Sequence, residues 1–419
     1  MVVVKALNAI FYNQDLVDID EVVAPPYDAI DAKTRSCLYK KSAYNVVRLI
    51  LNKEKDPYQN AQDNFYDWLQ KKVLVKNRRK CILYLVQKYR NAQKKLIERH
   101  GFIARVKIEE FSSKNIFPHE YTMDGPKRDR LELVEKTGAF FPPVFMIYRD
   151  PTQIIEKKIA SKYLTRLPFI NVHDGEGVEH IVHLIESRED LKLIEQVLLS
   201  KKLLIADGHH RYETAINYSK HHPENEAAKY VMSYFTNAAD KNLVIYPTHR
   251  IIEKLISRRE ILKKVAKYYD IEIVHDKVQF LNKIEIEKAK QITTGLVVKN
   301  DSNYYVLKLK KDVEKSLQFP PALQKLDLVI LHELVLKKEF GYTQEELLAQ
   351  KYIKYERRET AVFEAIRKEA SACFIVSCPR LEDVMNVVKC GYRMPQKSTY
   401  FSPKILSGLV INLLQHKNL

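Results

Sequence analysis

The sequence is poor in the residues that mark disordered or disulfide-linked chains. Its 419 residues include only 10 Gly and 16 Pro, which argues against low-complexity or disordered segments. The five cysteines are odd in number, widely scattered and without a Cys-x-x-Cys pair, so they suggest neither a disulfide framework nor a zinc ribbon. They are predicted to be reduced, mostly buried thiols: Cys37, Cys81, Cys373, Cys378 and Cys390.

Long apolar runs are also absent. No stretch approaches the roughly 18 uninterrupted apolar residues of a membrane span. The first residues, Met1 to Lys5, form one short apolar run without the longer core and cleavage site of a signal peptide. We therefore expect a cytoplasmic protein without a membrane partner.

Basic residues exceed acidic ones. The 70 Lys and Arg against 53 Asp and Glu give a net charge of +17, which raises affinity for polyanions such as nucleic acid. The basic residues are spread along the whole chain, with short clusters only at residues 76–80 and 357–358. A Lys-rich solvated surface explains the same charge, so nucleic acid is an alternative partner that the sequence does not favour.

Strand-like and helix-like segments alternate from end to end, which predicts a mixed α/β or α+β fold without internal repeats. We predict an N-terminal domain over residues 1–110, a catalytic core over 111–255, an accessory segment over 256–320 and a C-terminal segment over 321–419. The predicted strands are 45–50, 82–86, 294–298 and 304–309, and the predicted helices are 60–72, 261–269 and 328–337.

The motif Asp207-Gly208-His209-His210-Arg211 follows an apolar strand, residues 202–206, and precedes a helix-like segment. A strand-to-helix turn directs backbone N–H groups and the positive end of the helix dipole at one point, where a phosphate can bind. Gly208 would let the backbone approach closely. Asp207 is a candidate Mg²⁺ ligand, and the imidazoles and the guanidinium suit phosphate contact. The alternative is an Asp-Gly turn that caps a helix with surface histidines.

Two further segments carry polar side chains. Pro118-His119-Glu120 precedes a turn and a helix, so Glu120 is a candidate general base. Pro395-Gln396-Lys397-Ser398-Thr399 offers a Lys and two hydroxyls on an extended loop, which are useful for screening phosphate charge. Taken alone, each segment also fits an ordinary solvated loop.

In their order, these three segments resemble those of the archaeal free L-serine kinase, which carries Pro-His-Glu, then Asp-Gly-His-His-Arg between a strand and a helix, then Ser-Pro-Lys-Thr-Thr. Around the central motif the chain also resembles the wider superfamily that includes ParB and sulfiredoxin, which implies a core of that fold. Nearly the whole chain is similar to a prokaryotic family catalogued as domain of unknown function number one thousand and fifteen. That similarity is carried by Ala24-Pro25-Pro26-Tyr27-Asp28, Asp207 to Arg211, Pro247-Thr248-His249-Arg250 and Met394 to Tyr400.

The kinase resemblance implies a role for each matched residue. Glu120 would take the proton from the substrate hydroxyl, Asp207 would place the metal or the hydroxyl, and Gly208 to Arg211 would bind phosphates. Lys397, Ser398 and Thr399 would close over the site. This reading assumes that the three motifs converge in space. Further candidates for substrate binding are Tyr27, Asp28, His119 and Arg250.

The expected activity is a phosphoryl transfer from ATP or ADP, with Mg²⁺, to free L-serine or a similar hydroxy compound. The superfamily resemblance and the net charge leave a ParB-like, nucleotide-dependent DNA-binding protein as the alternative, although no convincing helix-turn-helix follows the central motif. A nucleotide-binding regulatory protein without transfer activity is a third interpretation.

Overall fold

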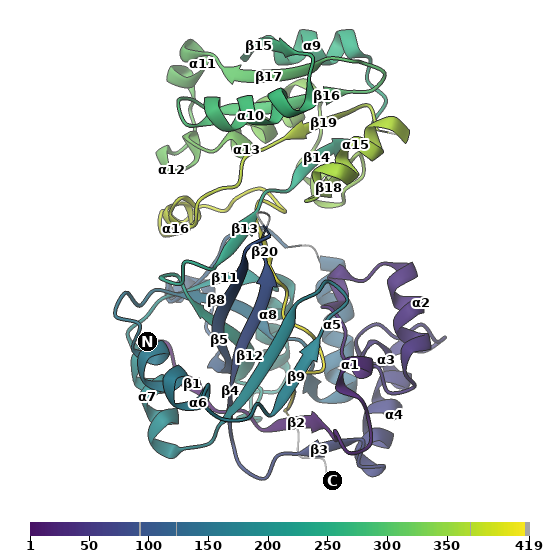
Figure 1. The fold of residues 1–419 in the computed structure, drawn as a ribbon, viewed down its shortest axis with the longest axis vertical. Helices are drawn as coiled ribbons and strands as arrows, with labels where there is room; N and C mark the ends of the chain where they lie inside the picture. The colour runs from purple at the N-terminus through teal and green to yellow at the C-terminus, as the bar shows by residue number, and fades with distance from the viewer. Residues whose placement is uncertain (92–93, 123, 369, 415–419) are drawn as a thin grey trace. The chain divides into compact units, whose positions relative to one another are not determined.

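The computed structural model describes residues 1–91, 94–122, 124–368 and 370–414 (Figure 1). Within them the chain forms two compact units. Unit 1 contains the described residues of 1–118, 124–244 and 403–414, and unit 2 contains those of 119–122 and 245–402. Both units combine helices with sheets, which confirms the predicted mixed α+β class. No helix of these four stretches has the length and apolar character needed to cross a membrane.

The two units interleave along the sequence, whereas the four predicted segments follow chain order. The C-terminal segment returns to unit 1 because β21 (Ile411–Leu413) pairs with β2 (Ala9–Tyr12), with Ala9 opposite Asn412. Pairing over such a separation leaves no signal in local composition, so sequence reasoning places these residues in different domains.

Unit 1 is built on a nine-stranded sheet. Its strands are β1 (Val4–Lys5), β4 (Ile82–Arg90), β5 (Leu96–Lys107), β6 (Ile116–Pro118), β8 (Val144–Tyr148), β9 (Ile170–His173), β10 (Glu179–Ile185), β11 (Leu203–Asp207) and β12 (Tyr230–Asn237). The order is β6-β11-β8-β12-β5-β4-β10-β9, with β1 also pairing with β5. β6 runs parallel to β11, and β8 runs parallel to β12. The predicted strand at residues 82–86 is confirmed as part of β4.

A second sheet and a set of helices complete unit 1. The sheet has the order β3-β2-β21-β7, with β3 at Leu74–Lys76 and β7 at Ala139–Phe140. The helices are α1 (Ile19–Val22), η1 (Tyr27–Ala29), α2 (Ala32–Lys41), α3 (Val47–Ile50), α4 (Pro57–Gln70), η2 (Phe111–Ser113), α5 (Asp124–Thr137), η3 (Glu156–Ala160), α6 (Ser161–Tyr163), α7 (Arg188–Leu199) and α8 (His209–His221).

Helix α4 confirms the helix predicted over residues 60–72. The side chain of Asp56 accepts a hydrogen bond from the Gln59 N–H, and the proline at the first helical position fits the start of a helix. Ala61, Phe65 and Trp68 are spaced four and three residues apart and are buried. α5 packs against both α4 and α8, so these helices support the segment that follows β11 (Figure 1).

The strand predicted at residues 45–50 is wrong, because this segment forms the single helical turn α3. The Asn45 side-chain oxygen accepts the Val47 N–H, while its amide donates to the carbonyls of Glu21 and Val23. Val47, Leu49 and Ile50 are all buried. A short run that is buried on every side has no amphipathic period, so its apolar letters fit a strand and a buried helix equally well.

Unit 2 contains a six-stranded antiparallel sheet with the order β15-β17-β16-β19-β14-β18. These strands are β14 (His249–Ile252), β15 (Tyr269–Val274), β16 (Thr293–Val298), β17 (Tyr304–Leu309), β18 (Ile353–Glu356) and β19 (Ala372–Ile375); β13 (Val244–Tyr246) pairs separately with β20 (Tyr400–Ser402). The helices are α9 (Arg258–Val265), α10 (Lys277–Lys288), α11 (Lys311–Ser316), α12 (Pro321–Gln324), α13 (Asp327–Ile330), η4 (Leu331–Glu339), α14 (Gln344–Leu348), α15 (Glu359–Lys368) and α16 (Leu381–Lys389).

These elements confirm the predicted strands at 294–298 and 304–309 and the predicted helix at 328–337, which continues from α13 into the π-helical η4. The helix predicted over 261–269 ends at Val265, and Tyr269 instead begins β15.

Helices cover both faces of the six-stranded sheet (Figure 1). Buried residues of α9, α13 and η4 form one core with one face, and those of α10 and α15 form a second core with the other face. A Cβ at Gly295 in β16 would lie 2.4 Å from Ile284 Cδ1, so α10 packs directly on the backbone of the sheet.

Candidate active site

The central motif forms the turn between β11 and α8, as predicted. β11 is buried through Ala206 and ends at Asp207. Gly208 has φ +86° and ψ 33°, in the left-handed region that glycine enters without strain, and α8 begins at His209. A Cβ at position 208 would lie 2.8 Å from Arg211 Cζ and Nε. Both the backbone angle and the close guanidinium therefore require glycine here.

Asp207 is held between two cations. One carboxylate oxygen forms an ion pair with Lys404 Nζ, and the other accepts a hydrogen bond of 2.5 Å from Arg211 Nη2. The side chains of Asp207 and Lys404 are only 16% and 15% exposed, so both contacts lie in a largely desolvated environment. Such charge-assisted hydrogen bonds fix the carboxylate in one orientation.

Arg211 is buried and holds the Asp207 carboxylate in place. Its Nη1 donates to the Pro143 carbonyl in addition to the Asp207 contact, and the side chain is 8% exposed. Its Nε is buried and has no hydrogen-bond partner in the part of the chain that the structure describes. The guanidinium thus positions Asp207; its predicted contact with phosphate remains a prediction.

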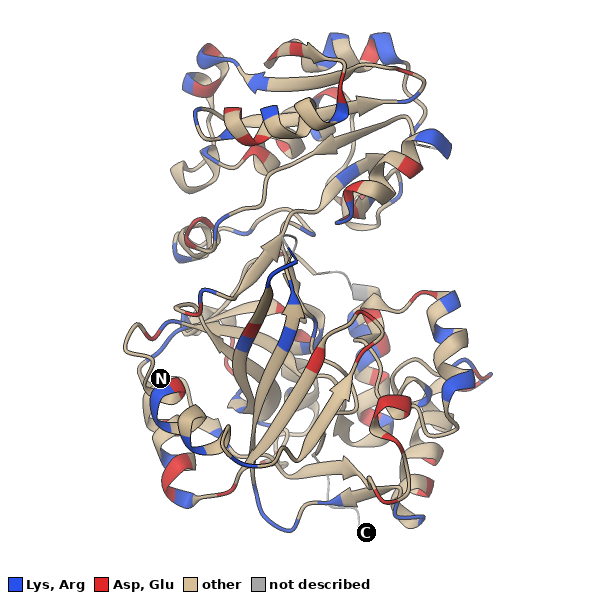
Figure 2. Ribbon diagram, viewed as in Figure 1, with Lys and Arg blue, Asp and Glu red and all other residues tan. Residues whose placement is uncertain are grey.

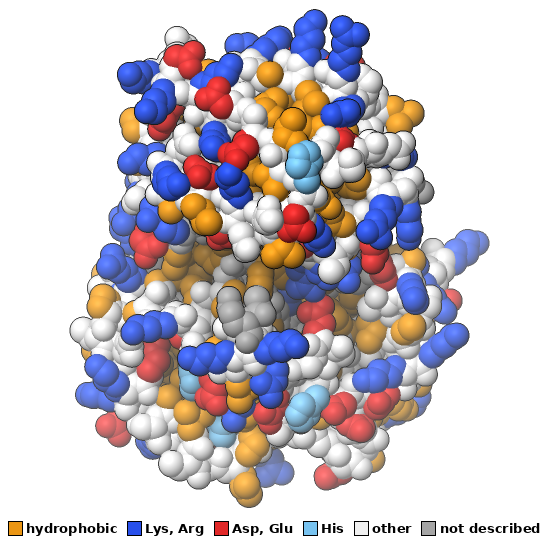
Figure 3. Space-filling model, turned by 45° about the horizontal axis from the view of Figure 1, so that its top comes forward, with side chains coloured by type: hydrophobic (Ala, Val, Ile, Leu, Met, Phe, Trp, Pro, Cys, Tyr) orange, Lys and Arg blue, Asp and Glu red, His pale blue; other side chains and the backbone are white. Residues whose placement is uncertain are grey.

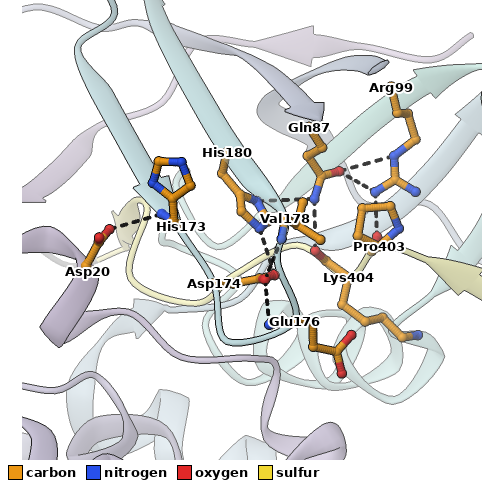
Figure 4. A network of polar contacts seen from close by, with 10 residues as sticks. All are labelled: Asp20, Gln87, Arg99, His173, Asp174, Glu176, Val178, His180, Pro403 and Lys404. Atoms are coloured by element: carbon orange, nitrogen blue, oxygen red, sulfur yellow. Dashed lines mark hydrogen bonds and ion pairs between the residues drawn. The ribbon is translucent and has the colours of Figure 1, made fainter. Parts of the chain in front are cut away.

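Lys404 is anchored through its backbone by a network of polar contacts (Figure 4). Arg99, which is fully buried, donates from Nη2 to the Pro403 carbonyl at 2.5 Å and also binds Gln87 Oε1. Gln87 Nε2 donates to the Lys404 carbonyl at 3.0 Å. The guanidinium carbon lies 4.9 Å from the centre of the Phe145 ring, which stabilises the buried cation. Strands β4 and β5 therefore fix the backbone that carries Lys404.

The network continues to a histidine and a carboxylate in and beside β10 (Figure 4). His180 Nδ1 lies 3.2 Å from Gln87 Nε2, and His180 Nε2 lies 3.1 Å from Asp174 Oδ2. Burial lowers the pKa of His180, so the imidazole is neutral and donates to Asp174 through Nε2. Burial acts to raise the pKa of Asp174, but hydrogen bonds from His180 and from the Val178 N–H outweigh it and lower that pKa. Each member thereby fixes the orientation of the next.

Sequence reasoning missed Lys404. The triplet Ser402-Pro403-Lys404 repeats, without a gap, the first three residues of the Ser-Pro-Lys-Thr-Thr stretch. Residues 395–399, which are predicted to match this stretch, do so only if Gln396 is treated as an insertion. What favours them is that they carry two hydroxyl side chains. The uninterrupted triplet was the signal that could have identified Lys404.

The N-terminal motif contributes to unit 1. Ala24 pairs with Ser407, which ties Ala24-Pro25-Pro26-Tyr27-Asp28 to the segment that carries Lys404. Arg130 Cζ lies 4.1 Å from the centre of the Tyr27 ring. Burial, with Asp28, raises the pKa of Tyr27 to about 12, against the opposing charges of Arg130 and Arg211. Tyr27 therefore lies within electrostatic reach of the Arg211 guanidinium, whereas Asp28 is exposed.

His209 and His210 form the first turn of α8. His209 is buried and His210 is half-buried. The first turn of any helix leaves backbone N–H groups without partners inside the helix and carries partial positive charge. The turn therefore has the strand–glycine–helix form that the sequence predicts. Its binding of an anion remains a prediction.

The second and third predicted motifs come together in unit 2. His119 Nε2 lies 2.8 Å from Thr399 Oγ1, and the His119 carbonyl accepts the Met394 N–H at 2.8 Å. Glu120 Oε1 accepts the Ser398 N–H at 2.9 Å and lies 3.5 Å from His119 Nε2. Because the Glu120 side chain is 13% exposed, it keeps a small contact with solvent.

Arg250 holds the loop that carries these hydroxyls. It is fully buried, and its Nη2 donates to the carbonyls of Gln396 and Lys397 at 3.3 and 3.2 Å. Burial lowers the pKa of Arg250 to about 10, although the ionisable groups of Tyr355 and Asp327 act to raise it. Arg250 therefore holds the loop at residues 396–397 in place through buried hydrogen bonds. Its contact with a substrate remains a prediction. Lys397, by contrast, is exposed and has φ +54°.

The structure thus gathers His119, Glu120, Ser398 and Thr399 in unit 2, and it gathers the central motif with Lys404 and Tyr27 in unit 1. In the parallel pair β6 and β11, Pro118 lies opposite Ile205.

The described side chains do not form a protein-only metal site. Among the described residues there is no group of three His, Cys, Asp or Glu side chains that could hold a metal ion. Both Asp207 oxygens contact cationic side chains, which disfavours a further cation there. The predicted role of Asp207 as a Mg²⁺ ligand thus has no support from this geometry.

The basic residues are dispersed. Figure 2 shows Lys and Arg intermixed with Asp and Glu over the ribbons of both units. On the face drawn in Figure 3, basic side chains lie among acidic, apolar and uncharged ones. Protein surfaces that bind nucleic acid usually cluster their basic residues on one face or helix.

The chain belongs to the family described as Protein of unknown function (DUF1015), whose model matches residues 4–329. No curated protein matches the chain in sequence.

Several solved structures share a partial likeness. A free serine kinase mutant in complex with ADP is 15% identical, with 73% of this chain and 91% of that chain covered and a TM-score of 0.38. A conserved hypothetical protein from Pyrococcus furiosus is 16% identical, with 71% and 92% covered and a TM-score of 0.35. SbnI from Staphylococcus aureus, truncated at its C-terminus, is 9% identical, with 76% and 90% covered and a TM-score of 0.38. Likeness at this level does not carry function from one chain to another.

Proposed function

We propose that this protein is a nucleotide-dependent phosphotransferase that moves a phosphoryl group from ATP or ADP to the hydroxyl of free L-serine or a similar hydroxy compound. The observation that carries the proposal is the β11–Gly208–α8 turn, where Asp207 is fixed between Lys404 and Arg211 at a helix N-terminus.

Unit 1 would bind the phosphates. The helix dipole and the two cations outweigh the single carboxylate, so the turn has a net positive potential. Lys404 reaches Asp207 from a rigid backbone and carries three N–H donors, so it is able to bind a phosphate oxygen while keeping its carboxylate contact. Fixed charges of this kind are what phosphoryl transfer requires, because positioning and charge stabilisation supply most of its catalysis.

Unit 2 would supply the general base. Glu120 is oriented by the Ser398 N–H and the His119 imidazole. A carboxylate with a fixed orientation and limited exposure is suited to accept the proton of a substrate hydroxyl. Ser398 and Thr399 then act by holding Glu120 and His119.

Mg²⁺ would enter with the nucleotide. In proteins this ion commonly keeps several waters and binds through one or two carboxylates together with substrate phosphates. Its chemistry would be to neutralise phosphate charge. The chain's own contribution is the turn, the two cations and the base.

The test is product formation by the full chain. We expect the protein with Mg²⁺, L-serine and either ATP or ADP to yield O-phosphoserine, followed by ³¹P NMR. Glu120→Gln should lower turnover by at least about 100-fold, the usual contribution of a general base, and leave nucleotide affinity unchanged. Glu285→Gln, at a side chain that is 65% exposed in α10, is the matched control and should retain full activity.

The absence of any phosphorylated product across a panel of hydroxy amino acids with both nucleotides would remove the proposal. Full turnover by Glu120→Gln would instead show that Glu120 is not the general base. The proposed phosphate-binding role of unit 1 would be unaffected.

A further inference from the structure

Unit 2 contains a cavity of about 490 Å³, and all its lining residues belong to that unit. This volume lies within the range of small-molecule sites, roughly 300–1,000 Å³. Apolar side chains from the segment before α13, from α13 itself and from α14 form much of its wall: Phe319, Leu323, Val329, Leu347 and Leu348. An apolar molecular body would therefore bind here favourably.

Two residues that line this cavity each have one buried polar atom without a hydrogen-bond partner among the described residues. Gln396 is 6% exposed, and its Oε1 is buried without a hydrogen-bond partner in the described chain. Tyr355 Oη is likewise buried, and the described residues offer it no partner. Leaving a buried polar group unpaired costs about 1–3 kcal/mol. A ligand with a hydrogen-bond donor would recover that loss at Gln396.

The position of Gln396 is fixed independently of any ligand. Its backbone carbonyl accepts from Arg250 Nη2 at 3.3 Å, and the same guanidinium donates to His332 Nε2 at 3.1 Å. His332 also lines the cavity, and burial together with Arg250 lowers its pKa well below the usual value, so its ring is neutral. The polar wall is thus preorganised.

The charges of the lining favour an anion. Lys337 and Arg393 are two cations, and Glu333 is the single carboxylate, so the lining carries a net charge of +1. Lys337 Nζ and Glu333 Oε1 are paired at 2.6 Å, and Arg393 Cζ lies 5.3 Å from the centre of the Tyr121 ring. Aromatic and basic side chains therefore lie together on one part of the lining.

We propose that this cavity binds a small organic anion with an aromatic or branched aliphatic body and a hydrogen-bond donor that reaches Gln396 Oε1. Such a molecule is larger and more apolar than serine. Its binding needs no nucleotide and no transfer reaction. Gln396 lies two residues before Ser398, whose N–H holds Glu120, so the occupant contacts the same loop as the proposed base.

The dye 1-anilinonaphthalene-8-sulfonate combines an aromatic body, an N–H donor and a sulfonate, and it serves as the probe. We expect one saturable site per full-length chain in a fluorescence titration under native conditions. Leu348→Trp fills the cavity and should abolish binding. Gln396→Leu removes the acceptor and should weaken binding about tenfold. Val278→Trp, at a side chain that is 65% exposed in the same unit, is the control and should change nothing.

Unchanged affinity in both Leu348→Trp and Gln396→Leu would overturn the proposal, as would the absence of a saturable site. Tyr355→Phe, which removes one oxygen, gives a second measurement if Leu348→Trp does not fold, and it should weaken binding severalfold. Displacement of the dye by ADP would assign the cavity to the nucleotide and would also overturn it. A failed kinase assay leaves these outcomes unaffected.

Discussion

The ion pair between Asp207 and Lys404 should be coupled more strongly than an ordinary surface pair. Two unit charges about 4 Å apart interact by roughly 4 kcal/mol at the effective dielectric near a protein surface. Arg211 shares the same carboxylate and remains after Lys404 is removed. We therefore expect a net coupling of about 2 kcal/mol, within the range for hydrogen bonds to charged groups. The change is a double-mutant cycle of Lys404→Met and Asp207→Asn.

The chain offers a selective reporter for this cycle. Trp68 is the single tryptophan, is 2% exposed and lies in α4 of unit 1, so its fluorescence follows the unfolding of the unit that holds the pair. Lys5 and Glu195, which are 44% and 29% exposed, form a control pair in the same unit, with an expected coupling of about 0.2–1 kcal/mol. A coupling for Lys404 with Asp207 no larger than that of the control pair would refute the reasoning.

Three further substitutions test side chains that stabilise unit 1 or unit 2. Gly208→Ala places a Cβ against the Arg211 guanidinium at positive φ, so urea unfolding followed by Trp68 should show a loss of more than about 1 kcal/mol; an unchanged midpoint would contradict the close packing. Arg99→Met strips Gln87 and Pro403 of a buried donor and should cost about 1–3 kcal/mol by the same measurement, and native stability would disprove its anchoring role. Burial lowers the pKa of His249 from 6.5 to about 4. Between pH 6.5 and pH 4 the unfolded chain therefore binds more protons than the folded chain. The free energy of unfolding should fall as the pH drops through this range, by up to about 3 kcal/mol. Urea unfolding followed by circular dichroism should show this pH dependence in the native chain and lose most of it in His249→Gln.

The parts of the site that sequence predicts are those set by neighbouring residues. An apolar strand, one glycine and a helical segment fix the turn at Gly208, because the backbone angle that glycine permits is a local property. Motif order correctly suggested that Glu120 belongs with Ser398 and Thr399, although the two segments are 278 residues apart. The ParB- and sulfiredoxin-like core remains a prediction.

The parts that sequence does not predict depend on burial and on partners far along the chain. Residue type makes Arg211 look like a phosphate ligand and Arg250 like a substrate ligand, yet burial directs their donors to Pro143 and to the carbonyls of the loop before Ser398. Lys404 reaches a partner 197 residues away, and the network of Gln87 on β4 and Arg99 on β5 holds the backbone that carries it. Composition and periodicity contain no trace of that pairing.

We expect unit 1 to depend on its C-terminal segment. Residues 403–414 lie beyond the 4–329 span that matches the family, yet they supply Lys404 and the strand β21. β21 is an inner strand, paired with β2 on one side and β7 on the other, so its loss would expose two strand edges at once. A chain that ends at Ser402 keeps the central motif, Gly208 and Arg211. It nevertheless lacks one cation of the pair at Asp207 and the strand that joins the two halves of the second sheet. We expect such a chain to fold poorly and to bind nucleotide weakly, and added C-terminal peptide should restore both properties if the missing contacts are the cause.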